Sequence, residues 1–154
     1  GPRHVAFHPD LPIAWVLNEL DSTVTTHSWN GKSGKLTPLE VISTLPGDFT
    51  ADNQTAEIEF VPRTNTLYVS NRGHNSIAMF RVNRASGGLR LIGWQATGGT
   101  APRFFGFDTS GGFLYAANLR SHTIRRFDVD MRTGALTPTR QIVKTESPCA
   151  IVFV

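Results

Sequence analysis

The sequence has almost no cysteine, no long apolar run and no sustained helical period. Cys149 is its only cysteine among 154 residues, which excludes an intramolecular disulfide framework. No apolar run approaches the roughly 20 residues of a membrane-spanning helix. No segment keeps an apolar period of 3.6 residues, so we expect little helix. The G-x-S-x-G nucleophile motif and the phosphate-binding P-loop motif are also missing.

Charge of a single sign is not concentrated anywhere along the chain. Fifteen Lys and Arg face twelve Asp and Glu, a net charge of +3, and the two signs are mixed. This mixing predicts no binding to nucleic acid or to a membrane, although the pI is near 9.5. A hydrophobic content of 40% is typical of a globular domain with a real core. No signal peptide is visible, and we expect a cytoplasmic location.

One phrase occurs three times, as NELDSTV (18–24), NRGHNSI (71–77) and NLRSHTI (118–124). Each Asn has an aromatic residue three positions before it and Phe eleven before it. Gly follows sixteen positions after each Asn, and Leu eighteen after. Agreement at this many positions is hard to obtain by chance, so the chain consists of three copies of one structural unit.

Each unit contains four short runs rich in Val, Ile, Thr and aromatic residues, separated by turn-forming residues. Four antiparallel strands repeated about every 47 residues form the blade of a β-propeller. The sequence therefore predicts an all-β fold, a single partial β-propeller domain. Its blades are expected over residues 1–54, 55–100 and 101–147, with a closing strand over 148–154.

Three blades do not close a ring, because propellers usually have four to eight. An open array leaves unpaired strand edges, so we expect association. The simplest form is a two-fold homodimer; the alternative is a missing N-terminal half. The first residues, GPRH, lack an initiator Met, which favours a processed or truncated chain.

The candidate site comes from positions where the three copies differ. The same position in each blade lies at the same height and radius, so polar residues there can converge near the axis. Three positions of the repeat matter here: the two that follow the Pro or Thr at the start of each unit, and the one that follows the Asn. Together they carry three arginines, two carboxylates and one histidine, namely Arg3, His4, Glu19, Glu57, Arg72 and Arg103. Arginines bind anions and stabilise an oxyanion, and a carboxylate or His can serve as general base. The alternative is that these residues join blades as ion pairs.

The remaining candidates are weaker. His74, three residues after Asn71, is a further substrate-binding candidate. The other histidines share no position in the repeat and have no metal-ligand spacing, so we expect neither a metal nor a cofactor. Cys149 is expected to be a buried small residue in the last strand.

Several motifs together resemble the lactonase family of seven-bladed propellers, which includes propeller-type 6-phosphogluconolactonases and carboxy-cis,cis-muconate cyclases. They are GPRHVAFHP, the NEL of WVLNELDSTV, SNRGHNSI and APRF. The resemblance covers the whole chain and implies the last three blades of a protein about twice as long. It places the family's polar cluster on Arg3, Glu19 and Arg72, with Glu57 and Arg103 at other motif positions.

The resemblance implies an enzyme that acts on a lactone, with a small anionic lactone as substrate. The first hypothesis is a sugar-lactone hydrolase of the 6-phosphogluconolactonase type. In it, Arg3 and Arg72 bind the anionic group or polarise the carbonyl, Glu19 orients or deprotonates water, and His4 supports them. The second is a muconate-type lactonising cycloisomerase, and the third is a non-catalytic propeller piece that serves assembly. The family's site also draws on N-terminal blades, which these residues lack.

Overall fold

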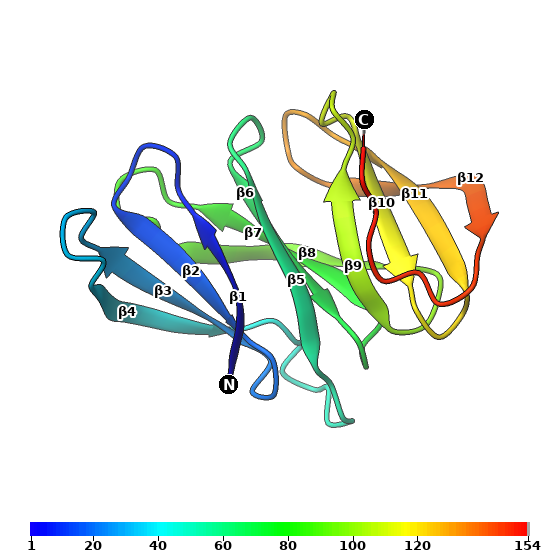
Figure 1. Cartoon of the computed structure of the whole chain (residues 1–154), viewed down its shortest axis with the longest axis horizontal. Coiled ribbons are helices and arrows are strands. Elements are labelled where there is room, and N and C mark those ends of the chain that lie inside the picture. The colour runs from blue at the N-terminus through cyan, green and yellow to red at the C-terminus, as the bar shows by residue number, and fades with distance from the viewer. Residues whose placement is uncertain (154) are drawn as a thin grey trace.

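The computed structural model describes residues 1–153, which contain twelve strands and no helix (Figure 1). No helix able to cross a membrane therefore occurs among them. The first sheet is β1 (Pro2–Phe7), β2 (Ile13–Asn18), β3 (Thr23–Trp29) and β4 (Leu36–Ser43). The second is β5 (Thr55–Val61), β6 (Thr66–Asn71), β7 (Ser76–Val82) and β8 (Leu89–Ala96). The third is β9 (Pro102–Phe107), β10 (Phe113–Asn118), β11 (Thr123–Val129) and β12 (Leu136–Lys144).

Each sheet is antiparallel and follows chain order, so each is one propeller blade. The first strands of the blades lie next to one another, with β5 between β1 and β9 (Figure 1), and each fourth strand forms the opposite edge of its sheet. The prediction of an all-β partial propeller with three four-stranded blades is confirmed.

The core lies between the blades. Strand β6 supplies both of its layers, because successive side chains point to opposite faces. Leu67 and Val69 pack toward the first blade with Trp15, whereas Tyr68 packs toward the third blade with Phe105. All six residues of β6 are buried, while β4 is exposed along most of its length. Middle strands buried on both faces explain why polar and apolar residues alternate only partly in the sequence.

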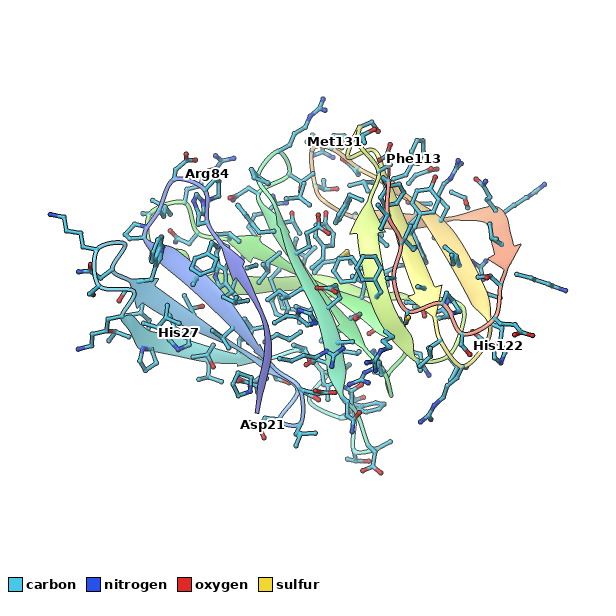
Figure 2. The ribbon with its side chains drawn as sticks, viewed as in Figure 1. Asp21, His27, Arg84, Phe113, His122 and Met131 are labelled. Atoms are coloured by element: carbon cyan, nitrogen blue, oxygen red, sulfur yellow. The ribbon has the colours of Figure 1, made fainter. Side chains whose placement is uncertain are left out.

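The loops divide between two ends of the molecule. Figure 2 shows Asp21 and His122, from the β2–β3 and β10–β11 loops, at one end, and Arg84 and Met131 at the other. The first end therefore carries all three copies of the phrase that begins with Asn.

A repeated hydrogen bond fastens each blade to the next. The Trp15 indole N–H donates to the carbonyl of Gly87 at 2.9 Å, and the Tyr68 hydroxyl donates to the carbonyl of Gly134 at 2.9 Å. Both glycines have positive φ, 70° and 73°, in the turn before the last strand of the neighbouring blade. Tyr115 occupies the same position in the third blade, and no hydrogen bond of its hydroxyl occurs within residues 1–153.

The C-terminal segment differs from the expected closing strand over 148–154. Residues 148–153 form no strand pairing, and residue 154 lies outside the described residues. Instead, the segment passes back across the third blade (Figure 1), where the ring of Phe153 lies 5.3 Å from that of Tyr115. The reason is that an innermost strand needs the second strand of its own blade, which residues 1–153 do not supply. Cys149, expected to be buried in that strand, is exposed.

We predict that Tyr68→Phe lowers the free energy of unfolding by about 1–2 kcal/mol, because the buried carbonyl of Gly134 loses its donor. Tyr115→Phe is the matched control and should change it by less than about 0.5 kcal/mol. Urea titration followed by circular dichroism measures both. Equal losses in the two variants would show that this hydrogen bond does not fasten the blades.

Candidate functional site

The residue after each Asn is fixed by a backbone hydrogen bond. Its N–H donates to the carbonyl of the residue just before the first strand of the same blade. The three bonds are Glu19 to Gly1 at 2.9 Å, Arg72 to Gln54 at 2.8 Å and Leu119 to Ala101 at 2.9 Å. The backbone thus holds this position in the same way in every blade, whatever side chain it carries.

A β-bulge sets the second group of candidate positions. Arg3 is the extra residue between the Pro2–Asn18 and His4–Leu17 pairs of the first blade. Arg103 is the extra residue at the same position of the third blade, and in the second blade the irregularity covers residues 56–57. A bulge redirects a side chain out of the regular alternation. It thereby frees Arg3 to reach across to its neighbours.

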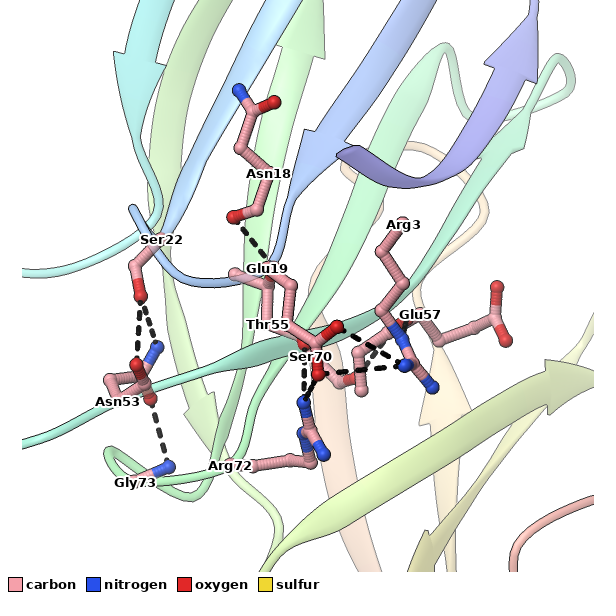
Figure 3. A network of polar contacts seen from close by, with 11 residues as sticks. Arg3, Asn18, Glu19, Ser22, Asn53, Thr55, Glu57, Ser70, Arg72 and Gly73 are labelled. Carbon is pink, nitrogen blue, oxygen red and sulfur yellow. Dashed lines mark hydrogen bonds and ion pairs between the residues drawn. The ribbon is translucent and has the colours of Figure 1, made fainter. Parts of the chain in front are cut away.

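Arg3, Glu19 and Arg72 form one cluster between the first and second blades (Figure 3). Arg3 Nη1 lies 3.4 Å from Glu19 Oε2, and Arg72 Nη2 donates to Glu19 Oε1. Each arginine also donates to a strand β5 carbonyl, Arg3 Nε to Ala56 at 2.8 Å and Arg72 Nη2 to Thr55 at 3.1 Å. The cluster therefore also joins the two blades, as the ion-pair alternative expected.

The two arginines control the ionisation of Glu19. Its partial burial acts to raise its pKa, but the hydrogen bond from Arg72 and the charge of Arg3 outweigh this effect. The net result is a pKa below the ordinary value of 4.5. Glu19 is therefore ionised at neutral pH.

The cluster has donor capacity left over. Arg72 Nε is buried and has no hydrogen-bond partner within the described residues. The Arg72 side chain is only 11% exposed. The Nε atoms of Arg125 and Arg126 are buried without a partner within residues 1–153 in the same way, so this feature does not by itself mark a ligand site.

His4 and Glu57 lie beside this cluster and face each other. His4 Nδ1 is 4.0 Å from Glu57 Oε1, and the His4 side chain is 43% exposed. The Glu57 backbone N–H donates to Ser70 Oγ at 3.0 Å, because the bulge removes its usual strand partner. The pair shares no described hydrogen bond with Arg3, Glu19 or Arg72.

Two predicted residues are not brought into the cluster. His74 Nδ1 lies 2.7 Å from Ser76 Oγ, and its ring packs against Phe49 with centroids 5.0 Å apart. Arg103 is half-buried, and within residues 1–153 it takes part in no ion pair. Neither residue contributes to the contacts around Glu19.

A cavity of about 570 Å³ opens beside Arg72, at the end that carries the Asn loops. Residues from all three blades line it, among them Leu20, Asp52, Arg72, Asn75, Ala101 and Arg120. Its volume is that of a small-molecule site. Arg3 and His4 line a second cavity of about 680 Å³ on the open face of the first blade.

Two charged residues lie outside the positions predicted from the repeat. Arg120 lines the first cavity, but it stands two positions after Asn118, where the other copies have Leu20 and Gly73. Glu59 lies in β5, at a position that holds Ala6 or Gly106 in the other blades. A charge where the repeat otherwise has small residues was the available signal for Glu59.

Glu59 is a carboxyl group in an apolar setting. It pairs across the strands with Tyr68, so its side chain lies on the face toward the third blade. Burial, with a smaller contribution from the charge of Glu57, raises the pKa of Glu59 to about 7. No group of three His, Cys, Asp or Glu suited to a metal ion occurs within residues 1–153.

The fold and the site define a class of protein: an open β-propeller with a charged cluster and a cavity at the end that carries the Asn loops. The family model "Lactonase, 7-bladed beta-propeller" matches residues 1–153, and the chain belongs to this family.

Relatives in this family have names that refer to lactones. The chain is 39% identical to a 6-phosphogluconolactonase of Bacillus subtilis over 99% of its own length and 44% of the relative. It is 34% identical to one of Pectobacterium carotovorum over 96% of its length and 44% of the relative. The solved periplasmic gluconolactonase PpgL of Pseudomonas aeruginosa superposes with a TM-score of 0.92 at 32% identity, over 97% of this chain and 41% of PpgL. The chain thus spans less than half the length of these relatives.

We predict that stability falls as pH rises from 4.5 to about 7, because the unfolded chain releases the Glu59 proton before the folded one does. Glu59→Gln should remove this decrease and make the protein more stable above pH 7. Urea midpoints across this pH range measure the effect, with the exposed Glu40→Gln as control. A wild-type profile that stays flat over this range would contradict the prediction.

Proposed function

We propose that this chain forms part of a lactone hydrolase that opens a phosphorylated sugar lactone of the 6-phosphogluconolactone type. The observation that carries the proposal is the Arg3–Glu19–Arg72 cluster next to a cavity of suitable size. The names of the relatives from Bacillus subtilis and Pectobacterium carotovorum support the choice of substrate.

The chemistry is the addition of water to an ester carbonyl. The water oxygen bonds to the carbonyl carbon, the bond from that carbon to the ring oxygen breaks, and a proton passes to the ring oxygen. Arg72, which lines the cavity, polarises the carbonyl and stabilises the oxyanion. Arg3 holds Glu19 in place from the other side.

Glu19 acts on the water. Its lowered pKa keeps it ionised, so it accepts a hydrogen bond from the attacking water at neutral pH. The same low pKa makes it a weak base, which favours orientation of the water over complete removal of its proton. His4, half-exposed and close to Glu57, is placed to support the bound substrate from the first blade.

We also propose that this activity needs four further blades, the seven of the family less the three present here. The outer faces of the first and third blades both expose groups that a neighbouring blade could contact. Tyr115 has an unused hydroxyl at the position where Tyr68 fastens the next blade. The opposite face leaves Val5 46% and Phe7 49% exposed. Two copies of this chain give six blades, so four blades of other polypeptide fit the family's ring better than a homodimer does.

Residues 1–154 alone should therefore sediment as a monomer and open no lactone. Mixed with the part of the Bacillus subtilis relative that they do not match, they should form a one-to-one complex that does. Tyr115→Phe should weaken this complex about fivefold, the effect of one hydrogen bond. Analytical ultracentrifugation combined with a lactonase assay measures this. A homodimer with lactonase activity would instead support the two-fold assembly.

In the completed ring, Glu19→Gln and Arg3→Ala should each lower kcat/KM for 6-phosphogluconolactone about tenfold or more, roughly 1.4 kcal/mol in the barrier. Glu40→Gln on the outer strand β4 is the control and should leave the rate unchanged. A parallel assay with carboxymuconate tests the cycloisomerase alternative. Wild-type rates in both variants would remove the cluster from the mechanism, and turnover of carboxymuconate alone would replace the hydrolase by the cycloisomerase.

A further inference from the structure

The cavity beside Arg72 carries a second arginine with no role in the cluster around Glu19. Arg120 lines this cavity from the third blade, whereas Arg72 lines it from the second. Asp52 is the only carboxylate among the lining residues, so the cavity has one more cation than anion. A cavity with excess positive charge favours an anionic ligand.

The backbone at Arg120 is held firmly, although its side chain is exposed. Its N–H donates to the carbonyl of Thr100 at 3.1 Å, and the N–H of Leu119 donates to that of Ala101 at 2.9 Å. Within residues 1–153, no ion pair or side-chain hydrogen bond engages its guanidinium group. All five donors of this group are therefore free for a ligand at the cavity rim.

The corresponding positions of the other blades cannot take this role. Leu20 in the first blade is apolar, and Gly73 in the second has no side chain. A Cβ at Gly73 would lie 1.9 Å from the backbone oxygen of Asp52, so this position tolerates only glycine. The charge at the rim therefore comes from the third blade.

We propose that Arg120 binds the phosphate group of the substrate, while the lactone carbonyl lies at the Arg3–Glu19–Arg72 cluster. This inference rests on the proposed function and adds the residue that selects phosphorylated over unphosphorylated sugar lactones. A guanidinium group matches the phosphate geometry with two parallel hydrogen bonds. A volume of about 570 Å³ is large enough for a six-carbon sugar acid phosphate, and both Arg72 and Arg120 line it.

The test uses stable products in place of the lactone, so that it does not depend on turnover. NMR titration of the ¹⁵N-labelled chain with 6-phosphogluconate and with gluconate gives two dissociation constants, and the Arg120 side-chain Nε–H signal reports contact directly. We expect 6-phosphogluconate to bind more tightly and to shift this signal. Arg120→Ala should weaken its binding about tenfold or more, with gluconate unchanged. Arg120→Lys should retain part of the preference, since it keeps the charge but not the paired donors.

Arg132→Ala is the matched control, an exposed arginine in the β11–β12 turn, and should leave both constants unchanged. The inference is overturned if wild type does not prefer the phosphorylated acid, or if Arg120→Ala weakens both ligands equally. Failure of the proposed function gives a different result, namely a completed ring that binds 6-phosphogluconate through Arg120 but hydrolyses no lactone.

Discussion

The site depends on the backbone hydrogen bond from the residue after each Asn to the residue that precedes the first strand of its blade. It joins the loop between the second and third strands to the point where the chain enters the blade. Because the bond uses only backbone atoms, it places no demand on the side chain. The architecture can therefore repeat three times while that position changes from Glu19 to Arg72 to Leu119. One backbone constraint thus permits a regular fold in which the side chain at this position differs from blade to blade.

The charge balance of the cluster follows from this placement. Two guanidinium groups share one carboxylate, because within residues 1–153 the neighbouring Glu57 faces His4 and forms an ion pair with neither arginine. Burying charges is costly unless they are paired, and a second anion would complete the pairing. In the proposed hydrolysis, negative charge that develops on the carbonyl oxygen would meet this requirement only as the reaction proceeds, and such charge is what a site must stabilise to increase the rate.

The sequence repeat predicted most of the fold, because every blade uses the same turns and the same packing residues. Comparison of equivalent positions also found Arg3, Glu19 and Arg72, which the structure brings together. The same comparison did not show that the ring of His74 contacts Ser76 and Phe49 and lies apart from the cluster around Glu19, and its predicted role in substrate binding stays a prediction. Those contacts depend on side-chain packing, which position in a repeat does not specify.

The remaining differences also have physical causes. Arg103 has the same bulge position as Arg3, but the third blade offers Leu119 where the first offers Glu19, so no carboxylate draws it into an ion pair. Arg120 was not predicted as a site residue, because the residue two positions after the Asn has no regular type in the repeat. The closing strand was expected from its sequence alone, yet strand pairing requires a neighbour that residues 1–153 do not contain.

The distribution of the charged groups over separate blades affects how such a site can vary. The cluster around Glu19 is built by the first two blades, whereas Arg120 belongs to the third and shares no described contact with it. Substitution of Arg120 leaves the protein contacts around Glu19 unchanged, although one substrate would touch both sites. In the proposed function, substitution at the cavity rim changes the contact to the phosphate group and leaves the ion pairs around Glu19 in place. Under that proposal, the division of the fold into separate sheets places the residue that selects the substrate on a different blade from the residues that act on the carbonyl.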